Sequence, residues 1–197
     1  MKELARSYDT AYRKHAFTTA EGKDITIDSG FYGWRMNRSE ETEELINLIK
    51  QGAVVEKEPV YIQTAASHGE RDYGDTYVEI NLSKQHLYFW EKGNIIIESD
   101  FVSGNMVKGM ATPGGIFPIT YKERNAVLKG TNYRTPVSYW MPFNGGIGMH
   151  DAPWRKQFGG TIYETNGSHG CINLPVDVAR EIYEHVEAGM PVICYYE

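Results

Sequence analysis

Residues 168–173 read Ser-His-Gly-Cys-Ile-Asn, between an Asn166-Gly167 turn and a helix that the sequence predicts to begin near Pro175. Backbone N–H groups and the dipole at a helix N-terminus can lower the pKa of a thiol and stabilise an oxyanion. We therefore expect Cys171 to have a depressed pKa. Gly170 would let the backbone approach a reacting group closely, because it has no Cβ. This stretch predicts a nucleophilic cysteine in a polar loop.

A nucleophilic thiol needs a base, which can be distant in sequence. His150 lies 21 residues before Cys171 and ends a short apolar, strand-like run, so its side chain could reach the thiol. His169 is the other nearby imidazole and is better placed to shape the loop. The residues alone favour His150 without deciding between the two.

A zinc site built from His150, His169 and Cys171 is the alternative interpretation of the same residues. Their spacing lacks the Cys-x-x-Cys or closely spaced histidine pair that zinc sites use, so we expect neither a metal nor another cofactor. Cys194 lies in an apolar segment at residues 191–197 and is expected to be a buried strand residue. A disulfide between the two cysteines is not expected, because it would consume the reactive thiol.

The pattern along the chain changes near residue 70. Downstream, alternating or apolar runs predict strands at residues 76–82, 86–90, 94–104, 115–120 and 191–197. One helix is predicted over residues 175–188, where apolar side chains recur at every fourth position before the stop at Gly189. On this helix His185 is expected to pair with Glu181 one turn earlier.

Upstream, residues 39–52 predict a short helix, with acidic residues in the first turn, an apolar stripe and a final glycine. The polar, glycine-containing segment 65–75 predicts a linker. We therefore expect two domains: a small α+β region at residues 1–71, followed by a mainly β domain with a late helix at residues 72–197.

Composition narrows the classes of function. The chain has 197 residues, 41% of them hydrophobic, and a formal net charge of −6 with a pI near 5.6. That charge argues against nucleic-acid binding, which needs a dense positive surface. The sequence lacks GxGxxG, Walker A, HExxH and GxSxG motifs and offers no carboxylate pair suited to glycoside hydrolysis.

The stretch at residues 168–173, with His150 upstream, resembles the L,D-transpeptidase catalytic domain, also called the YkuD domain. The family pattern is a histidine, a variable gap, and then [S/T]-H-G-C-apolar-N. Three more segments look typical of the family: ATPGGIF at 111–117, YRTPV at 133–137 and HDAPW at 150–154. The resemblance covers about residues 75–197 and implies a mainly β fold, a β-sandwich or barrel with the late helix.

The resemblance also implies the chemistry. Cys171 would attack the bond between the third residue and D-alanine at position four of a peptidoglycan stem peptide. His150 would accept the thiol proton, and Asp151 would orient His150 through its backbone carbonyl. Backbone N–H groups of Gly170 and Cys171, with the Tyr133 hydroxyl, would hold the oxyanion. The expected substrate-binding residues are Tyr133, Trp154, Ser168, His169 and Asn173.

The resulting thioester has two fates. Transfer to the side-chain amine of an acceptor stem gives a 3→3 cross-link, whereas transfer to water makes the protein an L,D-carboxypeptidase. The resemblance further implies that carbapenems, which are strained acyl donors, could acylate Cys171. A non-catalytic wall-binding module is the rival, although a degenerate domain should have lost at least one residue of the motif.

The resemblance also concerns the region that precedes the catalytic domain and the location of the protein. Residues 29–52 are similar to a peptidoglycan-binding region that often precedes it in Gram-positive enzymes, so residues 1–71 could bind peptidoglycan. Because that substrate lies outside the cytoplasmic membrane, we expect an extracytoplasmic protein at the cell wall. Residues 1–15 have no apolar segment of a signal peptide, so the expected signal or membrane anchor would lie outside this sequence.

Overall fold

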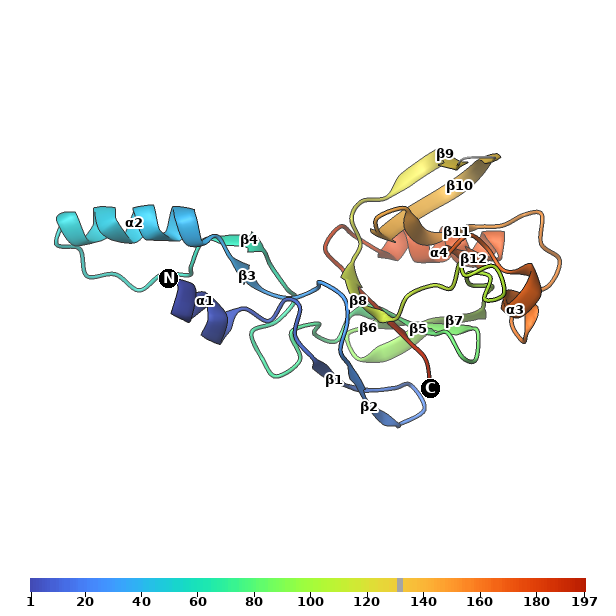
Figure 1. The fold of residues 1–197 in the computed structure, drawn as a ribbon, viewed down its shortest axis with the longest axis horizontal. Coiled ribbons are helices and arrows are strands. Elements are labelled where there is room, and N and C mark those ends of the chain that lie inside the picture. The colour runs from blue at the N-terminus through green and yellow to red at the C-terminus, as the bar shows by residue number, and fades with distance from the viewer. Residues whose placement is uncertain (131–132) are drawn as a thin grey trace.

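Two β-sheets form the larger part of the molecule. The structure is a computed structural model that describes residues 1–130 and 133–197. The five-stranded sheet has the order β7-β6-β5-β13-β8, and the four-stranded sheet has the order β12-β11-β10-β9. The sheets stay open, so the mainly β prediction is confirmed in the form of a sandwich, drawn on the right of Figure 1.

The five predicted strands are all present. They are β5 (Tyr77–Asn81), β6 (His86–Glu91), β7 (Asn94–Asp100), β8 (Gly115–Pro118) and β13 (Pro191–Tyr195). The second sheet is formed by β9 (Glu123–Gly130), β10 (Tyr133–Asn144), β11 (Ile147–Asp151) and β12 (Ile172–Leu174). Of these the sequence indicated only β11. The strand β9 shows no buried alternation because most of its side chains are exposed, and β12 has only three residues.

The core lies between the two sheets and the late helix α4 (Val176–His185). In β6, Leu87 and Phe89 are fully buried while their neighbours on the strand are partly exposed, which is the period-two pattern of a half-buried strand. From α4, Ala179 and Ile182 are fully buried against this core. The predicted helix is confirmed, and Gly189, with a φ of 90°, lies in the turn after it.

His185 at the end of α4 does not make the predicted pair with Glu181. Its Nδ1 lies 3.5 Å from a carboxylate oxygen of Glu91, and its ring packs 5.6 Å from that of Phe89. The end of α4 lies over the β6 strand, so a partner from the sheet replaces the partner one helical turn away.

The N-terminal region holds six short elements. They are α1 (Lys2–Tyr8), β1 (His15–Thr18), β2 (Asp24–Ile27), β3 (Arg35–Met36), α2 (Arg38–Lys50) and β4 (Tyr61–Gln63). The predicted helix is confirmed as α2, which begins where the Asn37 side chain accepts a hydrogen bond from the Glu40 N–H. Its apolar stripe is not fully buried, since Ile46 is 45% and Ile49 is 76% exposed. Figure 1 shows α1, α2, β3 and β4 extending away from the sandwich.

An aromatic cluster joins the N-terminal region to the outer face of the five-stranded sheet. Phe17 packs edge-on against Tyr73 and Tyr77, with ring centroids 5.8 and 5.9 Å apart. Tyr73 is only 1% exposed, so the predicted linker at 65–75 is irregular in structure but its end is packed into this cluster. The proposed division between residues 71 and 72 therefore falls inside a shared core and stays a prediction.

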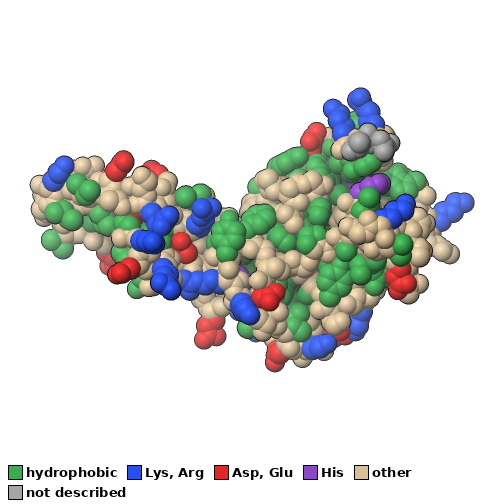
Figure 2. Space-filling view, viewed as in Figure 1, with side chains coloured by type: hydrophobic (Ala, Val, Ile, Leu, Met, Phe, Trp, Pro, Cys, Tyr) green, Lys and Arg blue, Asp and Glu red, His purple; other side chains and the backbone are tan. Residues whose placement is uncertain are grey.

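Two further features concern the whole chain. Both cysteines are free, and Cys194 is fully buried in β13 as expected. Among residues 1–130 and 133–197, no helix is long and apolar enough to cross a membrane. Figure 2 shows a narrow waist between the N-terminal elements and the sandwich, with basic side chains gathered on the N-terminal side of it.

Candidate active site

The Ser-His-Gly-Cys-Ile-Asn stretch is held from outside by the segment that follows β7. The Ser168 N–H donates to the Ser103 carbonyl at 2.8 Å, and the Asn105 N–H donates to the Ser168 carbonyl at 2.9 Å. At the other end of the stretch, Val102 and Asn173 exchange two backbone hydrogen bonds of 3.0 and 2.9 Å. The loop is therefore bound along its length to residues 102–105 and is not a free turn.

Inside the loop, side-chain hydroxyls bind the backbone. The Ser168 hydroxyl donates to the Cys171 carbonyl at 2.6 Å and accepts the Gly170 N–H at 3.0 Å. The buried Thr112 hydroxyl donates to the Gly170 carbonyl at 2.7 Å. Gly170 has a φ of 114°, a conformation that L side chains rarely adopt, so a glycine is required at this position.

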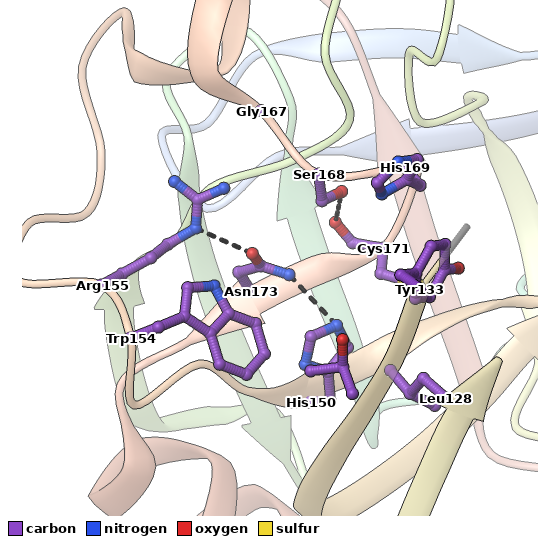
Figure 3. Close-up of a pocket in the computed structure, with 11 residues that line it drawn as sticks. Leu128, Tyr133, His150, Trp154, Arg155, Gly167, Ser168, His169, Cys171 and Asn173 are labelled. Carbon is purple, nitrogen blue, oxygen red and sulfur yellow. Dashed lines mark hydrogen bonds between the residues drawn. The ribbon is translucent and has the colours of Figure 1, made fainter. Parts of the chain in front are cut away.

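These bonds leave the Cys171 side chain at the wall of a pocket of about 240 Å³. Figure 3 shows its lining, which comes from the strands β9 to β12, the segment after β11 and the loop before β12. The lining residues are Leu128, Tyr133, Thr135, His150, Trp154, Arg155, Gly167, Ser168, His169, Cys171 and Asn173. All the residues predicted for the site lie in this lining, except Asp151 and Gly170.

His150 lies on β11 and is paired in parallel register with Asn173 on β12. Its Nδ1 lies 2.8 Å from the Asp151 carbonyl oxygen, and its Nε2 lies 3.1 Å from the Asn173 amide nitrogen. The Asn173 amide oxygen accepts a hydrogen bond of 2.8 Å from Arg155 Nε. Figure 3 shows this line of three side chains, Arg155, Asn173 and His150.

This line decides the tautomer of His150. A guanidinium can only donate, so the Asn173 oxygen must face Arg155 and its NH₂ must face His150. The His150 Nε2 is then an acceptor, and the ring proton is on Nδ1, where it is donated to the Asp151 carbonyl. Burial lowers the pKa of His150 as well, which favours the neutral ring. The Nε2 lone pair, which a general base needs, is thus unprotonated and accepts a hydrogen bond from the Asn173 amide in this structure.

The Asp151 carboxylate does not contact His150 but binds the backbone of β10. Its Oδ1 accepts the backbone N–H groups of Ser138 and Tyr139, at 2.8 and 2.9 Å. These bonds fasten the end of β11 to β10 and leave the carbonyl of Asp151 to hold His150. The geometry is the one expected for a residue that orients the imidazole through its backbone.

The thiol of Cys171 is not ionised in this structure. Burial raises its pKa to about 11, and its Sγ donates to the Gly146 carbonyl oxygen at 3.6 Å. The prediction of a depressed pKa for Cys171 is therefore wrong. The reason is that Cys171 directly precedes the strand β12, which separates it from the first turn of α4, so the thiol is buried in the sheet region and is not placed on a helix N-terminus.

The remaining predicted residues take separate places around the thiol. Tyr133 stacks on His169 with ring centroids 4.7 Å apart, and the exposed Trp154 ring lies 5.9 Å from that of His150. The Gly170 N–H, expected to hold an oxyanion, donates here to Ser168. In the described part of the chain, no three His, Cys, Asp or Glu side chains gather in the arrangement of a metal site.

The sequence-based prediction missed Leu128, Thr135 and Gly167 of the lining. It also missed two residues that support the site, Thr112 and Arg155. Thr112 lies in the ATPGGIF segment, but nothing in that segment indicates that its hydroxyl supports the Gly170 carbonyl. Arg155 directly follows the HDAPW segment, and a single arginine after a tryptophan carries no signal of its own. Both depend on contacts between residues distant in sequence.

Comparisons with known proteins find the same fold in L,D-transpeptidases. A crystal structure of a mutant Enterococcus faecium L,D-transpeptidase is 35% identical, covers 98% of this chain and 79% of that one, and has a TM-score of 0.81. The catalytic domain of the E. faecium enzyme acylated by ertapenem is 43% identical over 62% of this chain and 98% of that one, with a TM-score of 0.57.

Curated relatives are more distant in sequence. The Bacillus subtilis protein YciB is 28% identical over 125 residues, which are 59% of this chain and 64% of that protein. L,D-transpeptidase 2 of Mycobacterium tuberculosis is 27% identical over 89 residues, 45% of this chain and 20% of that protein. The chain thus spans less than two thirds of the curated relatives it matches. The model of the L,D-transpeptidase catalytic domain matches residues 75–194, more than half of the chain and the whole of the cysteine site, so this chain belongs to the YkuD family.

Proposed function

We propose that the protein is a peptidoglycan L,D-transpeptidase that works through a thioester on Cys171. The observation that carries the proposal is the pairing of a cysteine and a neutral histidine on the wall of one pocket. His150 is held by the Asp151 carbonyl, and its unprotonated Nε2 accepts a hydrogen bond from Asn173, which lines the same pocket. The donor would be a stem peptide that ends in D-alanine at position four.

The first half-reaction forms the thioester. The Cys171 proton moves to His150 Nε2 as the sulfur attacks the carbonyl carbon of the third stem residue. The tetrahedral intermediate collapses by breaking the C–N bond, and His150 gives its proton to the departing amine of D-alanine. Because the pKa of Cys171 is raised to about 11, few thiols are ionised at neutral pH and the base is indispensable.

For this transfer the resting hydrogen bonds must rearrange. The Asn173 amide occupies His150 Nε2, and the thiol faces the Gly146 carbonyl. Donor binding would turn the thiol from Gly146 toward His150. The Cys171 N–H and the Tyr133 hydroxyl would hold the oxyanion, and the Gly170 N–H could join them only after leaving the Ser168 hydroxyl.

The second half-reaction consumes the thioester. The side-chain amine of an acceptor stem attacks the acyl carbon, loses a proton to His150, and displaces the Cys171 thiolate, which takes that proton back. The product is a 3→3 cross-link. The partly exposed aromatic rings of Tyr133 and Trp154 at the pocket would keep the acceptor close and limit attack by water, which would give carboxypeptidase activity instead.

The same thiol should react with strained acyl donors. The catalytic domain of the E. faecium relative is acylated by ertapenem, so we propose that carbapenems acylate Cys171 in this protein as well. Because peptidoglycan is the proposed substrate, we also propose an extracytoplasmic location at the cell wall. Residues 1–71 would contact the polymer there, which remains a proposal about that region.

The test is the mass of the products formed from a disaccharide-tetrapeptide. We expect a dimer that has lost one D-alanine, whereas a free tripeptide would indicate hydrolysis. Cys171→Ala should abolish both products, and Cys194→Ala, which removes the buried cysteine outside the site, should retain them. Unchanged substrate with the wild-type protein, or activity that survives Cys171→Ala, would reject the proposal in favour of a non-catalytic wall-binding module or another nucleophile.

A further inference from the structure

Arg155 is a charged side chain of the pocket whose terminal nitrogens the proposed chemistry does not use. It is half-buried, it lies in the pocket lining with Cys171, and its Nε donates to Asn173 at 2.8 Å. That bond uses one of its five N–H donors. Figure 3 shows its two terminal nitrogens pointing away from Asn173, on the side of the pocket where Gly167 lies.

The positive charge of Arg155 has no acidic partner in the part of the chain that the structure describes. Among the described residues, no carboxylate forms a salt bridge with it, and the cause of its lowered pKa is burial alone. The two residues missing from the description, 131 and 132, are Thr and Asn and carry no charge. A half-buried guanidinium whose terminal nitrogens have no partner among residues 1–130 and 133–197 can bind an anion, most of all a planar carboxylate that accepts two bonds.

The position of Arg155 relative to the base limits which carboxylate this is. A single amide, that of Asn173, separates Arg155 from His150 Nε2. In the proposed reaction His150 protonates the amine of the departing D-alanine, and the carboxylate of that amino acid is attached to the same carbon as the amine. A leaving group whose nitrogen lies at His150 therefore carries its negative charge toward Arg155.

We propose that Arg155 binds the terminal carboxylate of the donor stem and thereby selects donors whose scissile bond is the last one in the chain. This inference rests on the proposed function. In a tetrapeptide the carboxylate of residue four is free, whereas in a pentapeptide the same group is an amide, which has no charge to offer Arg155. The guanidinium thus distinguishes a stem that ends at residue four from a longer one.

Carboxylate binding would also act on the base. The positive charge of Arg155 is one of the causes that lower the pKa of His150, after burial, while the Asp151 charge and carbonyl act in the opposite direction. A donor carboxylate would neutralise the guanidinium and remove that repulsion. His150 would then accept the thiol proton more readily when a correct donor is bound, so selection and activation would come from one contact.

The test compares two donors that differ only in this charge: a disaccharide-tetrapeptide and the same compound with a C-terminal carboxamide. Thioester formation on Cys171 is followed by intact mass, and kcat/KM is measured for release of D-alanine or D-alaninamide. We expect the wild-type protein to prefer the free acid by about 10- to 100-fold, the effect of a charge-assisted hydrogen-bond pair. Arg155→Gln should lose this preference by slowing the acid alone, and Arg155→Lys should retain part of it.

Lys156→Gln is the matched control, because it removes one positive charge from the exposed neighbour, which is not part of the pocket lining. It should leave the preference unchanged. Equal use of the two donors by the wild type would overturn the inference while leaving the proposed function in place, and this outcome does not depend on the folding of any variant. Equal slowing of both donors by Arg155→Gln would show that the residue only positions Asn173. Failure of the wild type with both donors would reject the proposed function itself.

Discussion

At the scale of single residues, the site works through protonation states that the surroundings impose. Cys171 and His150 are both neutral in the structure, because burial raises the pKa of the thiol to about 11 and lowers that of the imidazole. A neutral pair keeps the thiol from reacting indiscriminately. In the proposed mechanism catalysis then depends on the donor, whose binding would bring the thiol to His150 before the proton moves.

Alkylation of Cys171 by iodoacetamide should therefore rise with pH throughout the alkaline range. A thiol is an acid, so its raised pKa means that the reactive thiolate is scarce at neutral pH and becomes abundant only as pH approaches 11. Peptide mass spectrometry after timed labelling between pH 6 and pH 10 would give the rates. The fully buried Cys194 serves as the internal control and should stay unlabelled in the folded protein. A rate for Cys171 that levels off below pH 8 would contradict this prediction.

At the scale of elements, the loop at residues 168–173 is held in position by its neighbour, the segment at residues 102–105. Residues 102–105 pair with both ends of the loop, and Gly104 lies where no side chain fits. A Cβ on Gly104 would come within 1.9 Å of the Met110 carbonyl oxygen and 2.9 Å of the Gly170 Cα. The close contact between two backbones therefore sets the position of Gly170, the residue before the proposed nucleophile Cys171.

Gly104→Ala should lower acylation of Cys171 by about 100-fold, because a shift of about 1 Å in a reacting group is enough for such a loss. Acylation by a carbapenem, followed by intact mass, gives the rate without a natural donor. Gly109→Ala is the control: its φ of 67° also disfavours a side chain, but the space around it is open. If both variants acylate at the wild-type rate, the close approach at Gly104 does not position the loop.

At the scale of the whole molecule, the N-terminal region is fastened to the sandwich by aromatic packing and by one buried carboxylate. Glu79 of β5 accepts hydrogen bonds from the Trp90 indole, the Tyr195 hydroxyl and the Ala20 N–H, at 2.8, 2.7 and 2.8 Å. The carboxylate thereby links three neighbouring strands to the turn between β1 and β2. Phe17 from that hairpin is 2% exposed and packs beside this network.

Phe17→Ala should reduce the free energy of unfolding by about 3–5 kcal/mol, the usual cost of removing a buried aromatic ring from a packed cluster. Urea unfolding monitored by tryptophan fluorescence would measure it. Ile49→Ala on the exposed face of α2 should change stability by no more than about 0.5 kcal/mol. A loss for Phe17→Ala as small as that for Ile49→Ala would mean that the hairpin is not coupled to the stability of the sandwich.

Much of this protein could be predicted from its sequence, and the successes share a cause. The five strands, the helices α2 and α4 and the burial of Cys194 follow from local periodicity, which is present in the chain before it folds. The position of Ser168, His169 and Asn173 beside Cys171 in one pocket follows from a motif of adjacent residues. The strands β9 and β12 escaped because one is mostly exposed and the other has three residues.

Only the tertiary structure decided the protonation states of the site residues and the hydrogen-bond partners of their side chains. The sequence by itself determined that a cysteine, a histidine and an asparagine occur in an order typical of the family. The raised pKa of Cys171, the tautomer of His150 and the alignment of Arg155 with Asn173 depend on burial and on hydrogen bonds between residues far apart in the chain. Desolvation and hydrogen-bond direction belong to neighbours in space, so no local pattern of residues can encode them.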